Sequence, residues 1–265
     1  MKLAKFGGKK TRKKLMPPRY SFGYLENLEI KKMLKYYKSK NEDPKYSGLW
    51  EEKFCNLFSK FMGGGYTDAV ATGTGAIYVA MKALEIPRGS DVLICPVTCS
   101  GNLSCITEQG LNPILIDSEK GSYNTSLNKI KERLTNKTKL IQLTHAGGEP
   151  VQDIKEIAIF AKKKKIFLLE DCSQSIGASV KGKKIGTFGN ISAFSTMYRK
   201  NLAANSSSGL VFTKNKKFSD FIIFISSDNI LSFEILIIPF KFNFIAFIVD
   251  CSGLWPYFIE NLINL

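Results

Sequence analysis

The sequence predicts an α/β fold of the three-layer type, in which helices cover both faces of a mainly parallel central sheet. Short apolar runs of strand length alternate, between residues 66 and 217, with segments whose apolar residues recur at helical spacing. Alternation of this kind is typical of βαβ units and of a parallel sheet covered on both faces. Ligands of such folds bind beyond the carboxyl ends of the strands, so the residues that follow each strand are the first candidates for a site.

The elements follow one another in a regular order. Segments 25–39 and 48–62 have helical spacing, and a Gly-Thr-Gly turn at 73–75 opens a helix over 76–84. Asp91 and Pro96 bound a strand at 92–95, which precedes a weak helix at 101–109. The remaining predicted strands are 113–116, 140–143, 166–169, 191–194 and 210–213, and the remaining predicted helices are 127–134 and 154–163.

Composition excludes several classes of protein. The 265 residues are 44% hydrophobic and 23% charged, which is close to ordinary globular usage and unlike a disordered, collagen-like or disulfide-dense chain. Six cysteines without C-x-x-C spacing and a single histidine, His145, argue against a metal site. The basic N-terminus lacks an apolar segment behind it, so we expect a cytoplasmic protein with reduced thiols.

The net charge of +15 favours anionic partners. The basic runs, however, are scattered and carry no interleaved aromatic residues for base stacking, so we interpret them as solvated surface. Nucleic-acid binding remains an alternative of another class, and it predicts an affinity that falls steeply with salt.

Composition changes near residue 218. Segment 221–249 is rich in Ile and Phe, but Asp228, Glu234 and Lys241 interrupt it, which argues against a membrane span. We therefore predict residues 1–217 as an N-terminal helical segment plus a ligand-binding domain, with 218–265 as an unassigned, atypical tail.

Three features could carry chemistry. Backbone N–H groups at a helix start, with the Thr74 hydroxyl, can bind an anion. Asp171 follows a strand and could pair with a protonated ring nitrogen, although a helix cap is the commoner role of such an Asp. Lys200 could attack a carbonyl if its amine were desolvated, although solvent exposure is the simpler interpretation of one Lys among many.

Taken in order, these features resemble the DegT/DnrJ family of nucleotide-sugar aminotransferases, which are pyridoxal-phosphate enzymes of fold type I. The resemblance runs from about Phe6 to about Lys217. The matching pieces are GTGA at 73–76, DVLICP at 91–96, PILID at 113–117, HAGGEP at 145–150, EDCSQS at 170–175, GKKIGTFG at 182–189 and FSTMYRKNL at 194–202.

The resemblance implies a cofactor, pyridoxal 5'-phosphate (PLP), and roles for individual residues. Lys200 would form the covalent imine with PLP and later move a proton, and Asp171 would keep the pyridine nitrogen protonated. The resemblance also implies that Thr74, the Gly75 amide and Ser195 bind the phosphate, that Gln174 lies near the ring, and that Cys99 stands where the family often stacks an aromatic residue. His145 matches a family histidine and is a substrate-side candidate, while a structural imidazole is at least as good an interpretation.

The resemblance further implies transfer of an amino group from glutamate or glutamine to a nucleotide-linked keto sugar, in polysaccharide biosynthesis, by a homodimer. The family's C-terminal domain is not recognisable here, so the alternative is a truncated or inactive member that binds PLP without turnover. A dehydratase is less expected, since such variants carry histidine where this chain has Lys200.

Overall fold

The computed structural model describes residues 8–9, 23–43, 48–204 and 207–227. The chain divides into two compact units, 1–43 and 44–265. In the first unit, helix α1 spans Tyr24–Lys40. The Gly23 N–H donates to the Glu26 carboxylate at 2.8 Å at its start, and Asn41, with a φ of 53°, ends it in the left-handed conformation typical of helix ends.

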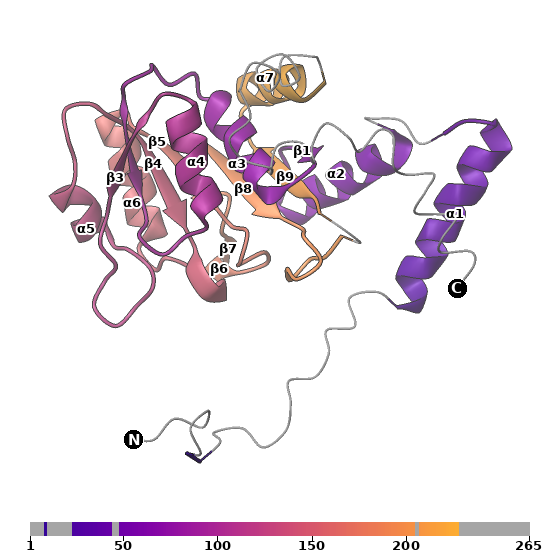
Figure 1. The fold of residues 1–265 in the computed structure, drawn as a ribbon, viewed down its shortest axis with the longest axis horizontal. Coiled ribbons are helices and arrows are strands. Elements are labelled where there is room, and N and C mark those ends of the chain that lie inside the picture. The colour runs from indigo at the N-terminus through magenta and orange to yellow at the C-terminus, as the bar shows by residue number, and fades with distance from the viewer. Residues whose placement is uncertain (1–7, 10–22, 44–47, 205–206, 228–265) are drawn as a thin grey trace. The chain divides into compact units, whose positions relative to one another are not determined.

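The second unit is built on a seven-stranded sheet in the order β1-β9-β8-β5-β4-β2-β3 (Figure 1). Strands β3, β2, β4, β5 and β8 run parallel, whereas β9 is antiparallel to both β8 and β1. The predicted mainly parallel sheet is therefore confirmed. The strands are β1 Tyr66–Val70, β2 Asp91–Ile94, β3 Asn112–Leu115, β4 Thr138–Thr144, β5 Phe167–Asp171, β8 Ile191–Ser195 and β9 Gly209–Thr213.

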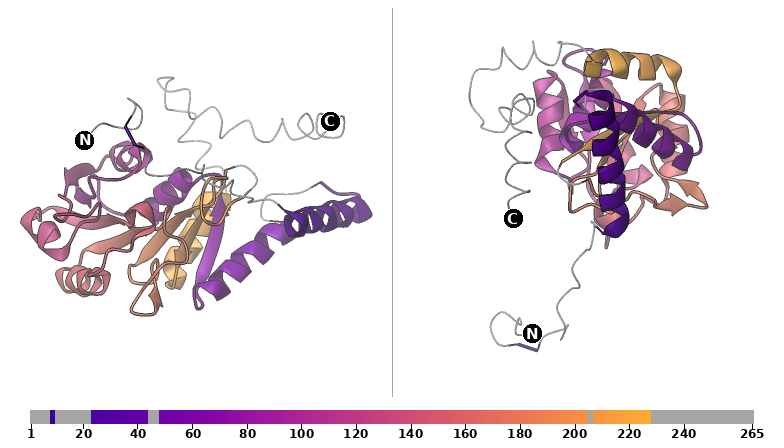
Figure 2. Two further views of the ribbon diagram at one scale, coloured as in Figure 1. Left: turned by 90° about the horizontal axis from the view of Figure 1, so that it is seen from below. Right: turned by 90° about the vertical axis from the view of Figure 1, so that its right-hand side faces the viewer.

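Helices cover both faces of this sheet and give the predicted three layers (Figure 2). One face packs against α3, α4 and α7, and the other against α2, α5 and α6. The helices are α2 Leu49–Phe61, α3 Gly73–Lys82, α4 Ser100–Glu108, α5 Leu127–Glu132, α6 Ile154–Lys164 and α7 Lys216–Ser227. The short pieces are the 3-10 turn η2 Ala146–Gly148 and the hairpin of β6 Ser179–Val180 with β7 Lys183–Lys184.

Strand alternation assigns each buried side chain to one of the two faces. On β5, Leu168 packs with the α2, α5 and α6 layer, and Leu169 packs with the α3, α4 and α7 layer. Both leucines are at most 1% exposed, and burying such a side chain contributes about 1.5–3 kcal/mol. The same alternation continues into the two acidic residues that end the strand, Glu170 and Asp171.

Strand β1, the β6–β7 hairpin and helix α7 were not predicted. Strand β1 has Asp68 in its middle, so its pattern does not indicate a strand. The β6–β7 hairpin is too short to leave a periodic signal. Helix α7 crosses the predicted boundary at 217 and buries Ile222 and Ile225, so the first residues of the predicted tail pack against the sheet.

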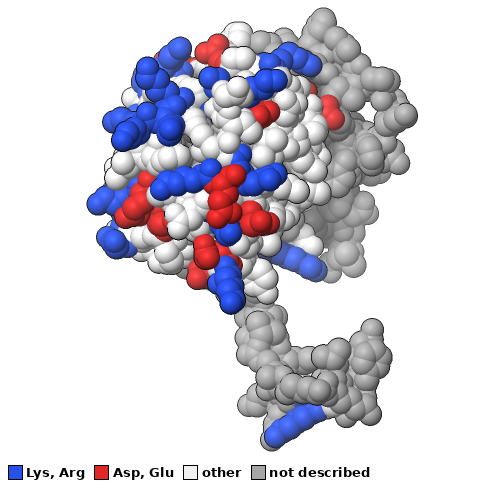
Figure 3. Space-filling view, turned by 90° about the vertical axis from the view of Figure 1, so that its left-hand side faces the viewer, with Lys and Arg blue, Asp and Glu red and all other residues white. Residues whose placement is uncertain are grey.

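The rest of the Ile/Phe-rich segment, 228–249, lies outside the described residues, and the boundary at 217 stays a prediction. Among the described helices, none has the length and apolar composition that a membrane crossing needs. On the face shown in Figure 3, Lys and Arg side chains form several separate groups with Asp and Glu between them. This distribution fits the interpretation of the basic runs as solvated surface.

Candidate active site

The carboxyl ends of neighbouring strands meet at one edge of the sheet. Thr144 at the end of β4 is paired with Asp171 at the end of β5, and Asp171 is paired with Ala193 of β8. Ser195 ends β8 opposite Gly209 of β9. This is the edge at which the fold class predicts a ligand, and the register brings the predicted residues Asp171 and Ser195 to it.

The Asp171 carboxylate is 4% exposed and is held by two donors. The Ser173 N–H donates to Oδ1 at 3.0 Å, and Asn102 Nδ2 on helix α4 donates to Oδ2 at 2.7 Å. Asp171 therefore caps no helix here. Sequence reasoning missed Asn102, because neither its burial nor its hydrogen-bond partner is visible in the pattern of the weakly predicted helix at 101–109.

Behind Asn102 lies a short polar relay. Asn102 Nδ2 also donates to the Thr98 hydroxyl, which lies 3.0 Å from the Thr144 hydroxyl. Thr98 is in the loop between β2 and α4, and Thr144 is the last residue of β4. The loop after β2, the first turn of α4 and the ends of β4 and β5 are thus connected through side chains.

The start of helix α3 lies close to the end of β8. A Cβ added to Gly73 would lie 2.5 Å from the Ser195 Cβ, so only glycine permits this approach. Likewise, a Cβ added to Gly101 on α4 would lie 2.6 Å from the Thr74 hydroxyl. The first turn of α3 therefore lies against Ser195 at Gly73 and against α4 at Thr74, and hydroxyls and amides at a helix start suit a phosphate.

One predicted donor in this region is already engaged. The Gly75 N–H donates to the Thr72 hydroxyl at 2.8 Å, so Thr72 caps helix α3. The first intrahelical bond runs from the Ala76 N–H to the Thr72 carbonyl, which leaves the amides of Gly73 and Thr74 as the first-turn donors that helix geometry does not use. Sequence reasoning chose the Gly75 amide, and the geometry favours the two amides before it.

Lys200 lies in the loop that follows β8 and is half-buried. The loop is folded by backbone bonds, in which Thr196 N–H donates to Ser208 at 2.9 Å and Lys200 N–H donates to Met197 at 2.8 Å. The Ser195 hydroxyl accepts from the Met197 N–H at 3.4 Å. The lysine is therefore carried by an ordered turn that starts at the same strand end as Ser195.

Gln174 and Cys99 are both exposed and follow strand ends of the same sheet edge. Gln174 Oε1 accepts from the Gly147 N–H at 2.8 Å and so connects the loop after β5 to the loop after β4. Cys99 immediately precedes α4 and is a free thiol. Both side chains are accessible from solvent.

His145 is completely buried, and both of its ring nitrogens have protein partners. The Val151 N–H donates to Nδ1 at 3.0 Å, so Nδ1 is the acceptor and Nε2 carries the proton that faces Glu170 Oε2 at 3.3 Å. This geometry favours the structural imidazole over the substrate-side candidate.

Glu170 is equally buried and organises the loop after the β6–β7 hairpin. Its carboxylate accepts from the N–H groups of Gly186 at 2.7 Å, Phe188 at 2.8 Å and Gly189 at 2.6 Å. Cys172 joins this group, and the ligand atoms of His145, Glu170 and Cys172 lie within 4.8 Å of one another. Burial raises the pKa of the Cys172 thiol well above its usual range.

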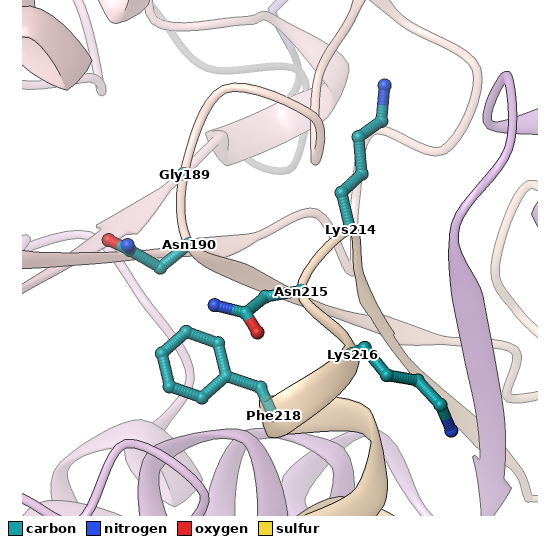
Figure 4. Close-up of a pocket in the computed structure, with 6 residues that line it drawn as sticks. All are labelled: Gly189, Asn190, Lys214, Asn215, Lys216 and Phe218. Atoms are coloured by element: carbon teal, nitrogen blue, oxygen red, sulfur yellow. The ribbon is translucent and has the colours of Figure 1, made fainter.

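A separate hollow of about 500 Å³ lies at the other end of the strands, away from the candidate site (Figure 4). It is placed where β8 begins and β9 ends, and Lys216 on its rim pairs with Asp220. Its lining residues are Gly189, Asn190, Lys214, Asn215, Lys216 and Phe218. None of the predicted site residues belongs to it, so this hollow is distinct from the candidate site.

Comparison with known proteins gives one consistent result. Residues 28–232 match the DegT/DnrJ/EryC1/StrS aminotransferase family. A GDP-perosamine synthase of Escherichia coli O157:H7 is 35% identical over 173 residues, which are 65% of this chain and 47% of the relative. A UDP-N-acetyl-3-dehydro-alpha-D-glucosamine 3-aminotransferase of Acidithiobacillus ferrooxidans is 34% identical over 143 residues, or 54% of this chain and 38% of the relative.

Solved structures agree with the sequence matches. An aminotransferase from Psychrobacter cryohalolentis superposes with a TM-score of 0.72 at 28% identity, covering 78% of this chain and 51% of that one. The E. coli GDP-4-keto-6-deoxy-D-mannose-3-dehydratase with bound hydrated PLP gives a TM-score of 0.63 at 25% identity, covering 66% and 46%. The chain spans about half the length of the proteins that it matches.

Proposed function

The chain belongs to the DegT/DnrJ/EryC1/StrS aminotransferase family, and we propose that it binds PLP and transfers an amino group to a nucleotide-linked keto sugar. The observation that carries the proposal is the convergence of Asp171, Ser195 and the start of helix α3 at one edge of the sheet. The bound PLP of the solved E. coli relative supports the choice of cofactor.

The donor set fits the phosphate group of PLP. The Thr74 and Ser195 hydroxyls and the amides of Gly73 and Thr74 are donors, and the lack of a side chain at Gly73 lets Ser195 lie against the start of α3. A helix N-terminus adds a favourable dipole toward a dianion. We therefore assign phosphate binding to Thr74, Ser195 and these two amides, with Gly75 stabilising the helix start.

When it is bound, PLP supplies an electron sink for the substrate carbanion. Asp171 would hold the proton on the pyridine nitrogen, because two protein donors fix the orientation of its buried carboxylate. Lys200 Nζ would hold the cofactor covalently and would carry the proton that is moved between the substrate and the cofactor. Gln174 and Cys99 are exposed near the same strand ends, and we propose that they would contact the ring.

The substrate assignment rests on the relatives. The two sequence relatives are named for GDP- and UDP-linked sugars, which supports an anionic nucleotide sugar and is compatible with the net charge of +15. We propose glutamate or glutamine as the amino donor and a homodimer as the assembly. We also propose a cytoplasmic location, as expected from the sequence.

Absorbance spectroscopy of the purified chain tests the proposal. Added PLP is expected to produce an absorbance band near the visible edge, and borohydride reduction followed by peptide mapping is expected to locate the cofactor on Lys200. Lys200→Ala should abolish the trapped adduct completely, because no other amine is expected at this position. A wild-type chain that binds no PLP, or that is trapped at a different lysine, would refute the assignment.

A second candidate function is PLP binding without turnover, which the half-length match to the relatives favours. The PLP-loaded chain mixed with glutamate or glutamine separates the two. Loss of the PLP band with formation of the 2-oxo acid supports amino transfer. An unchanged spectrum with every amino donor supports the non-catalytic alternative.

A further inference from the structure

Asn102 is an unusual residue for its place in the fold. It is 1% exposed on helix α4, whose other buried residues are Cys105 and Ile106. A buried amide is costly unless it is hydrogen-bonded. Its two contacts are side chains on other segments, Asp171 and Thr98, and Asp171 lies 69 residues away in the sequence.

The partners fix the orientation of this amide. An ionised carboxylate can only accept, so the NH2 group of Asn102, and not its oxygen, must face Asp171 Oδ2 at 2.7 Å. The second hydrogen of the same NH2 group points to the Thr98 hydroxyl. Because the Thr98 oxygen accepts from Asn102, its own hydrogen is available for the Thr144 hydroxyl at 3.0 Å. The amide is thus held from one side and donates to the carboxylate on the other.

We propose that Asn102 is a positioning residue for Asp171, an inference that rests on the proposed function. With Ser173 N–H on Oδ1 and Asn102 on Oδ2, each carboxylate oxygen has one protein donor, so the plane of the carboxylate is fixed. The carboxylate is thereby held in one orientation, in which it would accept a hydrogen bond from the ring N–H of PLP and keep that proton on nitrogen.

The test compares Asn102→Leu, which keeps the size of the side chain and removes the donor, with a matched control. Asn190→Leu makes the same change at the opposite end of β5, where Asn190 Oδ1 accepts from the Leu168 N–H at 2.8 Å. The probe is PLP labelled with 15N in the ring, whose chemical shift reports protonation of that nitrogen. The second readout is the dissociation constant of PLP.

We expect Asn102→Leu to weaken PLP binding about tenfold, as the loss of one bond to a charged group implies, and to shift the 15N signal toward the unprotonated ring. Asn190→Leu should leave both readouts at the wild-type values. An Asn102→Leu chain with wild-type affinity and a protonated ring would overturn the inference and leave the proposed function intact. A wild-type chain that binds no PLP would overturn both.

Thr98→Val keeps the experiment decisive if Asn102→Leu fails to fold. It removes the bond that holds the amide and leaves the bond from Asn102 to Asp171. We expect the same two changes at a smaller size, about twofold to threefold in affinity for a neutral hydrogen bond. Wild-type values in Thr98→Val, with Asn102→Leu unfolded, would count against positioning by the relay.

Discussion

Two consecutive carboxylates at the end of β5 have opposite surroundings. Glu170 lies on the face of the sheet that α2, α5 and α6 cover, and its carboxylate accepts hydrogen bonds from three backbone amides and the His145 ring. Asp171 lies on the face that α3 and α4 cover, and its carboxylate accepts hydrogen bonds from the Ser173 N–H and the Asn102 side-chain amide. Both carboxylates are at most 4% exposed, so burial alone does not distinguish them.

The difference lies in acceptor capacity. A carboxylate offers about four lone-pair sites, and the protein fills them at Glu170 with four donors, whereas it supplies two at Asp171 within the described residues. The Glu170 carboxylate, which has four donors, organises the loop around it. The Asp171 carboxylate has two donors and lies at the carboxyl end of the parallel strands, so it can still accept a hydrogen bond from a ligand, as its proposed role requires.

The largest expected effect is on stability, at Glu170. Glu170→Ala leaves the amides of Gly186, Phe188 and Gly189 without their acceptor, and each unpaired buried donor costs about 1–3 kcal/mol. We expect the free energy of unfolding to fall by about 4 kcal/mol, by that principle, in chemical denaturation followed by circular dichroism.

Asp171→Ala is the matched variant on the neighbouring residue. It leaves the Ser173 amide and the Asn102 side chain unpaired, and Ser173 is only half-buried, so the loss of stability should be smaller, about 1–2 kcal/mol. PLP binding should suffer instead. Equal losses of stability in the two variants would contradict the distinction between a carboxylate with four protein donors and one with two.

A smaller effect is expected at His145. His145→Gln removes an imidazole that connects Val151 to Glu170, and we expect the free energy of unfolding to fall by about 1–2 kcal/mol, as for one or two buried hydrogen bonds. Titration with PLP, and the amino-transfer rate where one is measurable, should stay near the wild-type values once the variant is folded. A folded variant with a large loss of rate would restore the substrate-side role of this residue.

The sequence predicts the fold well because strands and helices here have strong periodic signals. The helix at α6 and the strands at β2, β4 and β8 are found within two residues at each end. Strand β1 could not be found, since Asp68 in its middle breaks the apolar pattern and its pairing with β9 is a long-range contact. Local patterns carry no information on such a partner.

The candidate site likewise has residues that the sequence could place and contacts that it could not. The ends of β5 and β8 place Asp171 and Ser195, so a correct strand prediction already brings both residues to one edge. Hydrogen-bond partners are a tertiary property, and for that reason neither the engagement of the Gly75 amide with Thr72 nor the role of Asn102 is visible in the sequence. The burial of His145 is hidden for the same reason.

The smallest expected effect concerns cysteine reactivity, which compares thiols buried in the core with the exposed thiol beside the candidate site. Burial raises the pKa of Cys95 and Cys105 to about 12, so near pH 8 these thiols stay protonated and unreactive, whereas Cys99 is exposed at the start of α4. We expect iodoacetamide to label Cys99 well before the two buried thiols, with peptide mapping by mass spectrometry as the measurement. Raising the pH increases the thiolate fraction of all of them, so the selectivity should narrow at strongly alkaline pH.

Bound PLP should slow the labelling of Cys99 several-fold, because the proposed site places this thiol against the ring. Cys99→Ser, which should lose the fast-labelling peptide, confirms the assignment of the modified residue. Equal labelling rates with and without saturating PLP would remove Cys99 from the site while leaving Asp171 and Lys200 in it. The proposed PLP site would then be formed only by the ends of β5 and β8 and the start of α3.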